Sequence, residues 1–459
     1  MVVRLRESWL ITALVCAAGV LVAFDDIAPL QQLAGTFGAS LAWAPLLLCG
    51  LLLPRDRLSI WPRALIVLAG LGFATTAVTL VLLPPEARGT NLYGKAFAVG
   101  IPVMVFFCIM VVAARLAAYR PSLVTMFGLV SLGVLLLFGM LDMVGALPRT
   151  GVWFLHGLDN LNQRARGGRF EASALGGGVL VALGTATLRV RKKAWALGIC
   201  AAAGVLAFLM PSRGTLAAGA VFCAAILCAV VLHRFIPRVG RWANHTIGSI
   251  LVIITLVGGF ALGWLVTAPQ WGGMSYSTSD AVRSVWGDVG LDVAIHNPAG
   301  MGYSAPIAWL PAYVQDAMDR YDGRFSASDF TELTDQINSG HDYGFSPKTM
   351  PSLVGVYLGA VGVLALIAMW LAIGRKAAEA WRSGYFMVAP AAIAVAIVSS
   401  AYFSSIYAWE QAFLLGALLG TRQLYWNEAP TQLLTPIAAR WSPGPAPARP
   451  SGMLGSERS

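Results

Sequence analysis

Charged residues are scarce in this chain. Only 12% of its 459 residues are Asp, Glu, Lys or Arg, and 57% are hydrophobic. A soluble domain of ordinary composition is about 25% charged. The low charge, together with a mean hydropathy of +0.70, excludes an ordinary soluble protein and predicts a polytopic membrane protein of the all-α class.

Cysteine and clustered metal ligands are also lacking where chemistry would need them. The six cysteines all lie in apolar runs, and none lies in the polar interval 268–347. We therefore expect no disulfide there. No His, Asp or Glu group has the spacing of a metal site, so neither a metal nor a cofactor is predicted. Since no internal repeat is visible, a transporter built from repeats is disfavoured.

Long apolar runs are abundant. A bilayer core of about 30 Å needs about 17–25 apolar residues per helix. This criterion predicts about twelve spans, at Ser8–Phe24, Ala34–Leu53, Trp61–Leu83, Phe97–Ala118, Ser122–Leu141, Ala172–Leu188, Ala194–Met210, Gly214–Leu232, Thr246–Thr267, Pro351–Ile373, Tyr385–Phe403 and Ser404–Thr421.

The basic residues predict the orientation of these spans. Twelve spans place both termini on one side, and that side carries 21 of the 32 Lys and Arg residues. Because basic residues concentrate on the cytoplasmic side, we expect both termini in the cytoplasm of a bacterium, with the protein in its inner membrane. The net charge of +10 is then explained mainly by the basic residues that set the orientation in the membrane. No nucleic-acid partner is predicted.

Two domains follow from this map. Residues 1–426 form a predicted transmembrane helical bundle, interrupted between spans 9 and 10 by a large periplasmic helical loop at 268–347. Residues 427–459 are rich in Pro, Ala, Ser and Gly, which predicts a disordered cytoplasmic tail.

The large loop has its own composition. It holds 10 of the 22 acidic residues and three basic ones. Ser279 or Asp280 is placed to cap a helix that contains Arg283. A second helix is expected to begin at Asp329, with Glu332 completing a capping box, and to end before His341. A multi-pass protein with one such loop is expected to act on that side of the membrane.

Arginines occur on the side that basic residues normally avoid. One group lies before the sixth span (Arg164, Arg166 and Arg169), Arg213 lies in a short link, and Arg283 lies in the loop. One interpretation is contact with lipid headgroups or loop carboxylates. The other is a pocket for a diphosphate, because guanidinium groups bind phosphate oxygens in pairs and keep their charge.

Four segments resemble the O-antigen ligase/polymerase superfamily of bacterial membrane glycosyltransferases. They are Pro211–Gly214, similar to a Ser-Arg-Gly motif; Arg283–Trp286 with Ile295–Tyr303, similar to an Arg-x-x-x-Trp and a His-Pro-x-x-Gly-x-Gly segment; Ser346–Pro347 with Val356–Gly362, similar to a Glu-Leu-Gly-x-x-Gly helix; and, more weakly, Arg164–Gly178. The resemblance covers roughly 164–362.

The chain departs from this family pattern at three places. Lys348-Thr349 stands where the family has His-Asn, Tyr357 replaces the glutamate, and Arg283 and Trp286 are one residue closer than is common. The nearest histidine to the first departure is His341.

The resemblance implies transfer of a glycan from an undecaprenyl-diphosphate carrier to an acceptor hydroxyl at the periplasmic face. Polymerase is the first expectation, with another lipid-linked repeat unit as the acceptor glycan. An O-antigen ligase, which uses lipid A core as acceptor, is the alternative. A lipid-linked glycan flippase is the alternative of another class. Membrane lipids and other polysaccharide export components are the remaining expected partners.

Cations carry the predicted catalytic chemistry. A diphosphate leaving group needs its developing charge stabilised, and arginines do this without a metal. Arg213 and Arg283 are the first candidates for this catalytic role. Arg166 and Arg169 are substrate-binding candidates.

The acceptor hydroxyl needs a base. Histidine, with an ordinary pKa of about 6.5, suits that role at neutral pH, so His341 is the candidate. A loop histidine without a catalytic role stays open. Lys348 is predicted to be a further phosphate-binding cation, and a lysine at the lipid interface is its alternative.

Two further residues complete the candidate site. Trp286 is a candidate for stacking on a sugar, with a place in the loop core as the alternative. Glu410 lies in an apolar run near the predicted outer end of the last span. Since carboxylates in spans are rare, Glu410 is predicted to bind the acceptor or to pair helices.

Overall fold

The computed structural model describes residues 2–21, 43–53, 60–143, 172–209, 213–232, 278–338, 347, 349–399 and 409–420. Within them, the chain forms 14 α-helices and a 3₁₀ turn. A hairpin of two short antiparallel strands, β1 (Glu86–Ala87) and β2 (Thr90–Asn91), is the exception to the all-α prediction.

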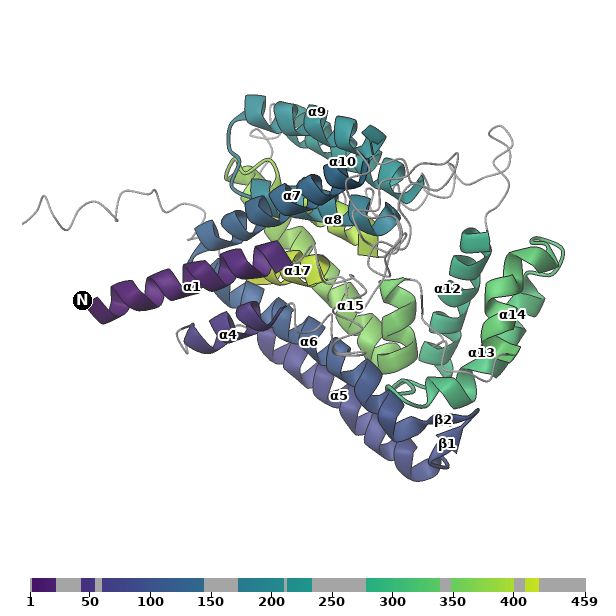
Figure 1. Cartoon of the computed structure of the whole chain (residues 1–459). Coiled ribbons are helices and arrows are strands. Elements are labelled where there is room, and N and C mark those ends of the chain that lie inside the picture. Colours follow the sequence, from purple (N-terminus) through teal and green to yellow (C-terminus); the bar gives the residue numbers. More distant parts are fainter. Residues whose placement is uncertain are drawn as a thin grey trace, which may run out of the picture.

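The helices follow one another along the chain with few other elements (Figure 1). In chain order they are α1 (Val2–Leu21), α4 (Ala44–Leu52), α5 (Ile60–Leu82), α6 (Leu92–Tyr119), α7 (Pro121–Met143), α8 (Ala172–Thr187), α9 (Lys193–Leu209), α10 (Arg213–Leu232), α12 (Thr278–His296), α13 (Pro306–Arg320), the 3₁₀ turn η4 (Ala327–Phe330), α14 (Thr331–Asn338), α15 (Met350–Arg382), α16 (Val388–Ile397) and α17 (Trp409–Gly420).

Four of the described helices, α5, α6, α7 and α15, are long and apolar enough to cross a membrane. Helices α5 to α10 match six predicted spans within a few residues. The predicted span 246–267 and the tail 427–459 lie outside the described residues.

Helix α15 departs from the prediction of one uninterrupted span at 351–373. It is longer, and it is broken at Gly359, whose φ of 61° and ψ of −152° are not helical. Such a conformation is almost restricted to glycine. The apolar residues on both sides of Gly359 hid this break from the hydropathy profile.

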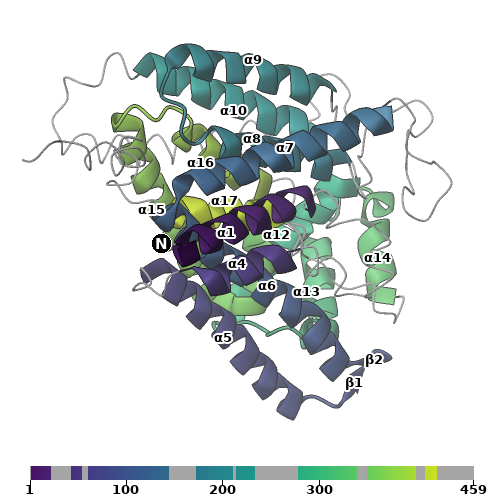
Figure 2. The same cartoon turned by 60° about the vertical axis from the view of Figure 1, so that its left-hand side comes forward.

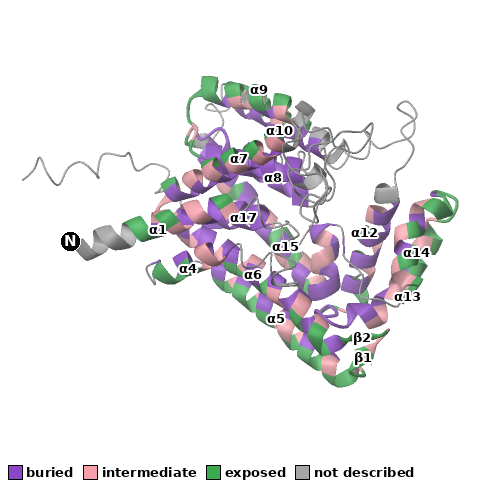
Figure 3. Cartoon of the chain, viewed as in Figure 1, coloured by how far each residue is buried: buried purple, intermediate pink, exposed green. Residues whose placement is uncertain are grey.

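The described chain divides into two regions (Figures 1 and 3). Helices α12 to α14, residues 278–338, pack together beside the β1–β2 hairpin and one end of α15. We call them the loop domain. The remaining helices form the apolar body, whose outward faces carry large exposed hydrophobic side chains such as Val81 and Leu364. This exposure fits a surface that contacts lipid.

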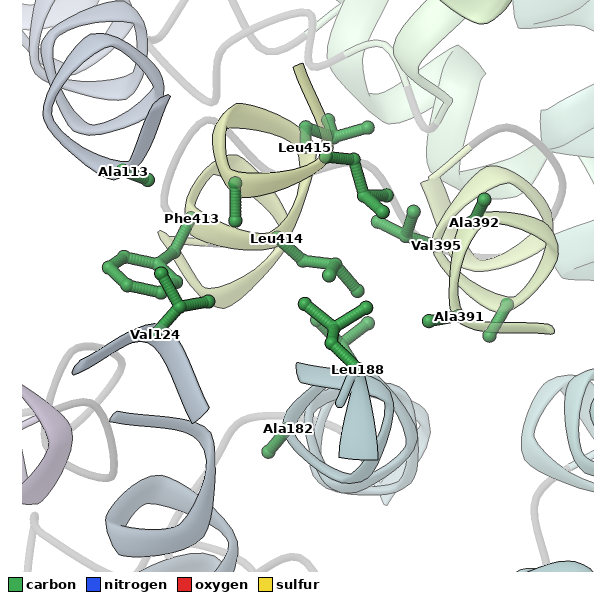
Figure 4. Packing of buried hydrophobic residues seen from close by; sticks show 14 of the residues in the cluster. Ala113, Val124, Ala182, Leu188, Ala391, Ala392, Val395, Phe413, Leu414 and Leu415 are labelled. Carbon is green, nitrogen blue, oxygen red and sulfur yellow. The ribbon is translucent and has the colours of Figure 1, made fainter. Parts of the chain in front are cut away.

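Helix α17 lies in the middle of the apolar body. All of its residues are buried, and Phe413 stacks on Phe127 of α7 with ring centroids 3.8 Å apart. Figure 4 shows Leu414 of α17 pointing towards Leu188, which follows α8. Helices α9 and α10 lie side by side farther from this centre (Figure 2).

Small residues allow the body helices to approach closely. A Cβ added at Gly416 would lie 2.2 Å from the carbonyl oxygen of Met110, and one at Gly420 would lie 2.0 Å from that of Ala114. Glycine is therefore required on α17 where it meets α6, and the matching spacing shows that the two helices run parallel.

Five helices of the apolar body, α6, α8, α10, α15 and α17, run in the same direction. At their C-terminal ends, the Lys376 ammonium of α15 donates to the Leu419 carbonyl of α17, and the Trp381 indole donates to the Ala229 carbonyl of α10. The Phe386 amide, just past α15, donates to the Val190 carbonyl after α8. All five therefore point their N-termini towards one end, which we call the loop-domain end.

Basic residues gather at the opposite end of the body. Arg115 there donates to the carbonyls of Gly50 and Leu53, at 2.8 Å each. The others include Arg120, Arg189, Arg191, Lys192, Lys193, Arg375 and Lys376. These relative directions and this distribution of charge are the ones that the predicted alternation of spans requires.

The loop domain has a core of large side chains and a charged surface. Trp286, Tyr303, Phe325 and Phe330 lie in one buried cluster. Ser326 caps η4 in a capping box with Asp329. The prediction that Asp329 and Glu332 form this box was therefore wrong by one turn, since a 3₁₀ turn precedes α14.

Candidate functional site

The turn that follows α12 docks into the break of α15. The amide of Met301 donates to the carbonyl of Val356 at 2.9 Å, and the amide of Gly302 donates to that of Tyr357 at 3.2 Å. In return, the amide of Val361 donates to the Pro298 carbonyl at 3.2 Å. Backbone groups freed by the break thus find partners in the turn, as a buried break requires.

Glycines make this approach possible. Gly300 and Gly302 have positive φ angles of 79° and 66°. A Cβ on Gly359 would lie 2.3 Å from both the Asn297 carbonyl oxygen and the Gly300 nitrogen. The two motifs with the sequences Gly-x-Gly and Leu-Gly-x-x-Gly therefore fit together backbone against backbone.

Tyr303 extends the contact into the apolar body. Its amide donates to the Thr76 hydroxyl of α5 at 2.8 Å, and its ring meets Phe73 edge-on at 5.1 Å between centroids. The side chain is 1% exposed and lies against Gly72 and Gly100. Burial raises the pKa of the Tyr303 hydroxyl above its ordinary range, so the group stays neutral.

Helix α12 runs alongside the start of α15. A Cβ on Gly355 would lie 2.3 Å from the Gly290 carbonyl oxygen, and one on Gly290 would lie 2.5 Å from the Ser352 Cα. Because Asn297, directly after the end of α12, meets Gly359, the two helices are parallel. Arg283 precedes Gly290 by about two turns on α12 and therefore lies beyond the contact of Gly290 with Ser352, towards the N-terminus of α12.

Arg283 is half-buried on α12, next to the buried Val282. Pro347 and Thr349, which flank Lys348 in the sequence, are both buried. Thr349 caps α15 by accepting from the Ser352 amide.

Arg213 begins α10, at the loop-domain end of the body. A Cβ on Gly176 would lie 2.1 Å from the Thr215 hydroxyl oxygen, so the first turns of α8 and α10 touch. A Cβ on Gly177 would lie 3.0 Å from Val398, beyond the end of α16. Arg169 precedes α8 by three residues in the sequence.

Trp286 is not at a surface. Its exposed fraction is 0%, and it packs in the core of the loop domain. No face of its ring is open to a sugar. Of the two predicted roles, the structure therefore supports a place in the loop core.

Glu410 lies in the first turn of α17 and is 2% exposed. The pairing of Gly416 with Met110 places it about level with Met104 of α6. It is thus a buried carboxylate inside the body, on the loop-domain side of the Gly416 contact. A role in helix packing and a role in acceptor binding are both compatible with this place.

The candidates His341, Lys348, Arg166 and Arg169 lie outside the described residues, as does the side chain of Arg213. In the described part of the chain, no group of three His, Cys, Asp or Glu residues is placed to hold a metal ion.

Sequence reasoning missed the residues that dock the loop domain. Thr75 and Thr76 of α5 bond the Ala299 carbonyl and the Tyr303 amide, and Asn297 bonds the Tyr313 hydroxyl at 3.0 Å. Two threonines in an apolar helix were the available signal.

Arg320 illustrates the other fate of a loop arginine. It pairs with Asp288, Asp292 and Asp316, and the hydrogen bond with Asp292 is the main cause that raises its pKa. The charge of Arg320 is therefore balanced by carboxylates of the loop domain itself.

The loop-domain end can attract an anion. The N-termini of α8 and α10 lie together there, and helix N-termini carry partial positive charge. Arg213 and Arg283 add full charges. No family model, characterised protein or solved structure matches this chain.

Proposed function

We propose that the protein is a membrane glycosyltransferase, a polysaccharide polymerase that uses a glycan linked to undecaprenyl diphosphate. The observation that carries the proposal is the docking of Ile295–Tyr303 into the break of α15, with Arg283 on the adjoining helix. Segments that are far apart in sequence and that resemble this enzyme class thus form one packed unit.

The proposed topology has twelve spans, with the loop domain in the periplasm. The gathering of basic residues at the opposite end of the body supports this orientation, since that end would face the cytoplasm. The donor diphosphate would then meet the loop-domain end at the outer surface of the inner membrane.

Arg213 and Arg283 stabilise the leaving diphosphate in this proposal. Their charge is permanent, and the N-termini of helices that begin at this end add dipoles of the same sign. Loss of one such donor typically costs about 2.7–4 kcal/mol of transition-state stabilisation. Arg166, Arg169 and Lys348 are proposed to hold the phosphates before and after transfer.

His341 is proposed as the base that accepts the proton of the acceptor hydroxyl. The segment that contains it precedes Pro347 in the sequence, and Pro347 is buried three residues before α15 begins. Glu410 is proposed to bind the acceptor. A ligase with lipid A core as acceptor would use the same donor chemistry, so the acceptor decides between the two.

The flippase alternative predicts a broken helix that lines a cavity. Helix α15 is broken, but the amides of Met301 and Gly302 occupy the freed carbonyls of Val356 and Tyr357. These two carbonyls and the amide of Val361 are bonded to the loop domain, so they are not available to a substrate or an ion. This favours the enzyme.

The test is transfer by the purified full chain in lipid nanodiscs. With undecaprenyl-diphosphate oligosaccharide alone we expect longer lipid-linked chains, and release of undecaprenyl diphosphate. Arg213→Ala and Arg283→Ala should each lower this release by roughly 10²–10³-fold. Turnover unchanged in both variants, with folding intact, removes the arginines from the site.

Arg320→Ala is the matched control. It removes an arginine from the same loop domain, but one already paired with Asp288, Asp292 and Asp316. Its transfer rate should stay near that of the unaltered protein. Product formed only when lipid A core is added would instead identify a ligase.

A further inference from the structure

The docked turn, residues 297–303, lies well inside the length of the helices that it contacts. Tyr303 lies against Gly100 of α6, and its amide donates to the hydroxyl of Thr76 on α5. Helix α5 continues beyond Thr76 to Leu82, a distance of about 9 Å, and α6 begins about 12 Å before Gly100. The turn is therefore about 10 Å from the ends of both helices.

The charged residues of α5 and α6 place the turn at the depth of hydrocarbon. From Arg63 to Thr76 along α5 is about 20 Å, and from Arg115 to Gly100 along α6 is about 22 Å. Because charged side chains are excluded from hydrocarbon, Arg63 and Arg115 mark one boundary of the bilayer core. The core is about 30 Å thick, so the turn lies about 8–10 Å inside the other boundary. A tilt of the helices would place it deeper.

The backbone of the turn is paired, as this depth requires. The carbonyls of Pro298 and Ala299 accept from α15 and α5. The amides of Met301, Gly302 and Tyr303 donate to the same two helices. Irregular backbone is tolerated within hydrocarbon only where protein groups satisfy it. The turn meets that condition.

The lipid-facing surface of the body continues across the turn. Pro298 and Ala299 are exposed. Thr75 of α5 donates to the Ala299 carbonyl, and Val78, one turn farther along α5, is exposed. On the other side, Val361 of α15 bonds the Pro298 carbonyl and is itself exposed. The turn thus fills the space between two exposed apolar helix faces.

Helix α12 extends this surface with two large apolar side chains. Leu291 is 58% exposed and Ile295 is 63% exposed. In the described residues 278–338, these two are the large hydrophobic side chains that are exposed. They lie one turn apart on the same face of α12, and Ile295 precedes Ala299 by one further turn. The exposed apolar groups of the loop domain therefore gather beside the turn.

The charged face of α12 points elsewhere. Asp288 and Asp292 pair with Arg320 of α13. The ring of His296 lies 6.4 Å from that of Tyr313, also on α13, between centroids. The carboxylates in the second half of α12 thus face α13, which leaves the two apolar side chains on a side of their own.

We propose that the end of α12 and the docked turn are re-entrant: they enter the bilayer core and leave it on the same side, and Ile295 and Ala299 contact lipid acyl chains. Leu291 is about 9 Å from Asn297 along α12 and therefore lies at the boundary of the core. The loop domain is then held by two partners, the backbone of α15 and the surrounding hydrocarbon. This inference needs a membrane protein, and it holds whether or not the protein transfers a glycan.

The test places cysteines along one face of α12. Gly287→Cys, Leu291→Cys and Ile295→Cys are each made in the full chain in phosphatidylcholine nanodiscs and treated with a membrane-impermeant maleimide. Peptide mass spectrometry measures labelling at each position separately from the native cysteines. Gly287→Cys is the matched control, because it is exposed on the same face and two turns farther from the turn. We expect Ile295→Cys to react roughly tenfold or more slowly than Gly287→Cys, with Leu291→Cys between them.

A second measurement identifies what covers the face. Ile295→p-benzoylphenylalanine is irradiated in the same nanodiscs, with Val78→p-benzoylphenylalanine on α5 as the lipid-exposed reference. We expect both to form adducts with phosphatidylcholine.

Each outcome decides the inference. Equal labelling at Gly287 and Ile295 puts the whole face in water and overturns it. Slow labelling at Ile295 with adducts to a peptide in place of lipid shows that protein covers the face, and also overturns it. Slow labelling with lipid adducts supports it, and a failure to transfer glycan would then refute the proposed function alone.

Discussion

The loop domain and the apolar body pack their helices together through different kinds of residue. The loop domain buries Trp286, Phe325 and Phe330, and its surface carries carboxylates and the Arg320 network. The body brings its helices together through residues such as Gly416 and leaves leucine and valine side chains outside. The difference follows from the surroundings of each region.

Water drives large apolar side chains together, so a core of aromatic rings stabilises the loop domain. Lipid offers no such drive between helices. There, close contact of backbones through small residues supplies the attraction. The border between the regions uses a third device, in which the turn after α12 bonds the broken backbone of α15. Each substitution below acts on one of these devices.

The border should be the most sensitive place. Gly359→Ala adds a Cβ 2.3 Å from the Asn297 carbonyl oxygen at a position with a φ of 61°. We expect the free energy of unfolding to fall by about 3 kcal/mol or more. We also expect the loop domain to separate from the body. Thermal unfolding in detergent and limited proteolysis of the loop domain measure this.

Gly287→Ala is the control for that substitution. Gly287 is exposed on α12 with nothing near its Cβ position. Alanine there should stabilise by about 0.5–1 kcal/mol because it favours the helix. Equal stability of the two variants would show that the border does not depend on the break.

Substitution of Tyr303 should have the second largest effect on stability. Tyr303→Ala empties the space beside Gly72 and Gly100 and should cost about 3–5 kcal/mol. Tyr303→Phe keeps the ring and removes a buried hydroxyl that has no hydrogen-bond partner in the described structure, so the stability should change by less than about 1 kcal/mol. A large loss in the phenylalanine variant would mean that the hydroxyl, rather than the ring, holds this contact.

Close packing in the body gives the third prediction. Gly416→Ala places a Cβ 2.2 Å from the Met110 carbonyl oxygen, so α17 must move away from α6. We expect a loss of about 1–3 kcal/mol in thermal unfolding. Gly70→Ala, on an exposed face of α5 with open space around it, should not destabilise. Similar losses in both would contradict packing by small residues.

Capping in the loop domain gives the smallest effect. Ser326→Ala removes the hydroxyl that donates to the Asp329 carboxylate at 2.6 Å. The free energy of unfolding should fall by about 1 kcal/mol. Hydrogen exchange should rise in η4 and α14 and stay unchanged in α17. Thr334→Ala, an exposed change within α14, should leave the exchange of η4 as it is. Faster exchange throughout the body would show that the two regions do not respond separately.

Several features were predictable because they depend on local patterns. Long apolar runs predicted α5, α6 and α7, since one helix crosses a bilayer with about 20 such residues. The acidic composition of 268–347 predicted a polar helical region, and Arg283 was placed correctly on a helix. The role of Trp286 was not predictable, because a tryptophan in a polar loop suits both a core and a sugar platform.

Sequence alone therefore determined the membrane class, most helix positions and the polarity of the large loop, because hydropathy and helical length act within one segment. Only the tertiary structure decided that α15 breaks at Gly359 and that Tyr303 inserts beside Gly72. These features arise when backbone groups and side chains from segments far apart in sequence satisfy one another, and no local pattern records such a pairing.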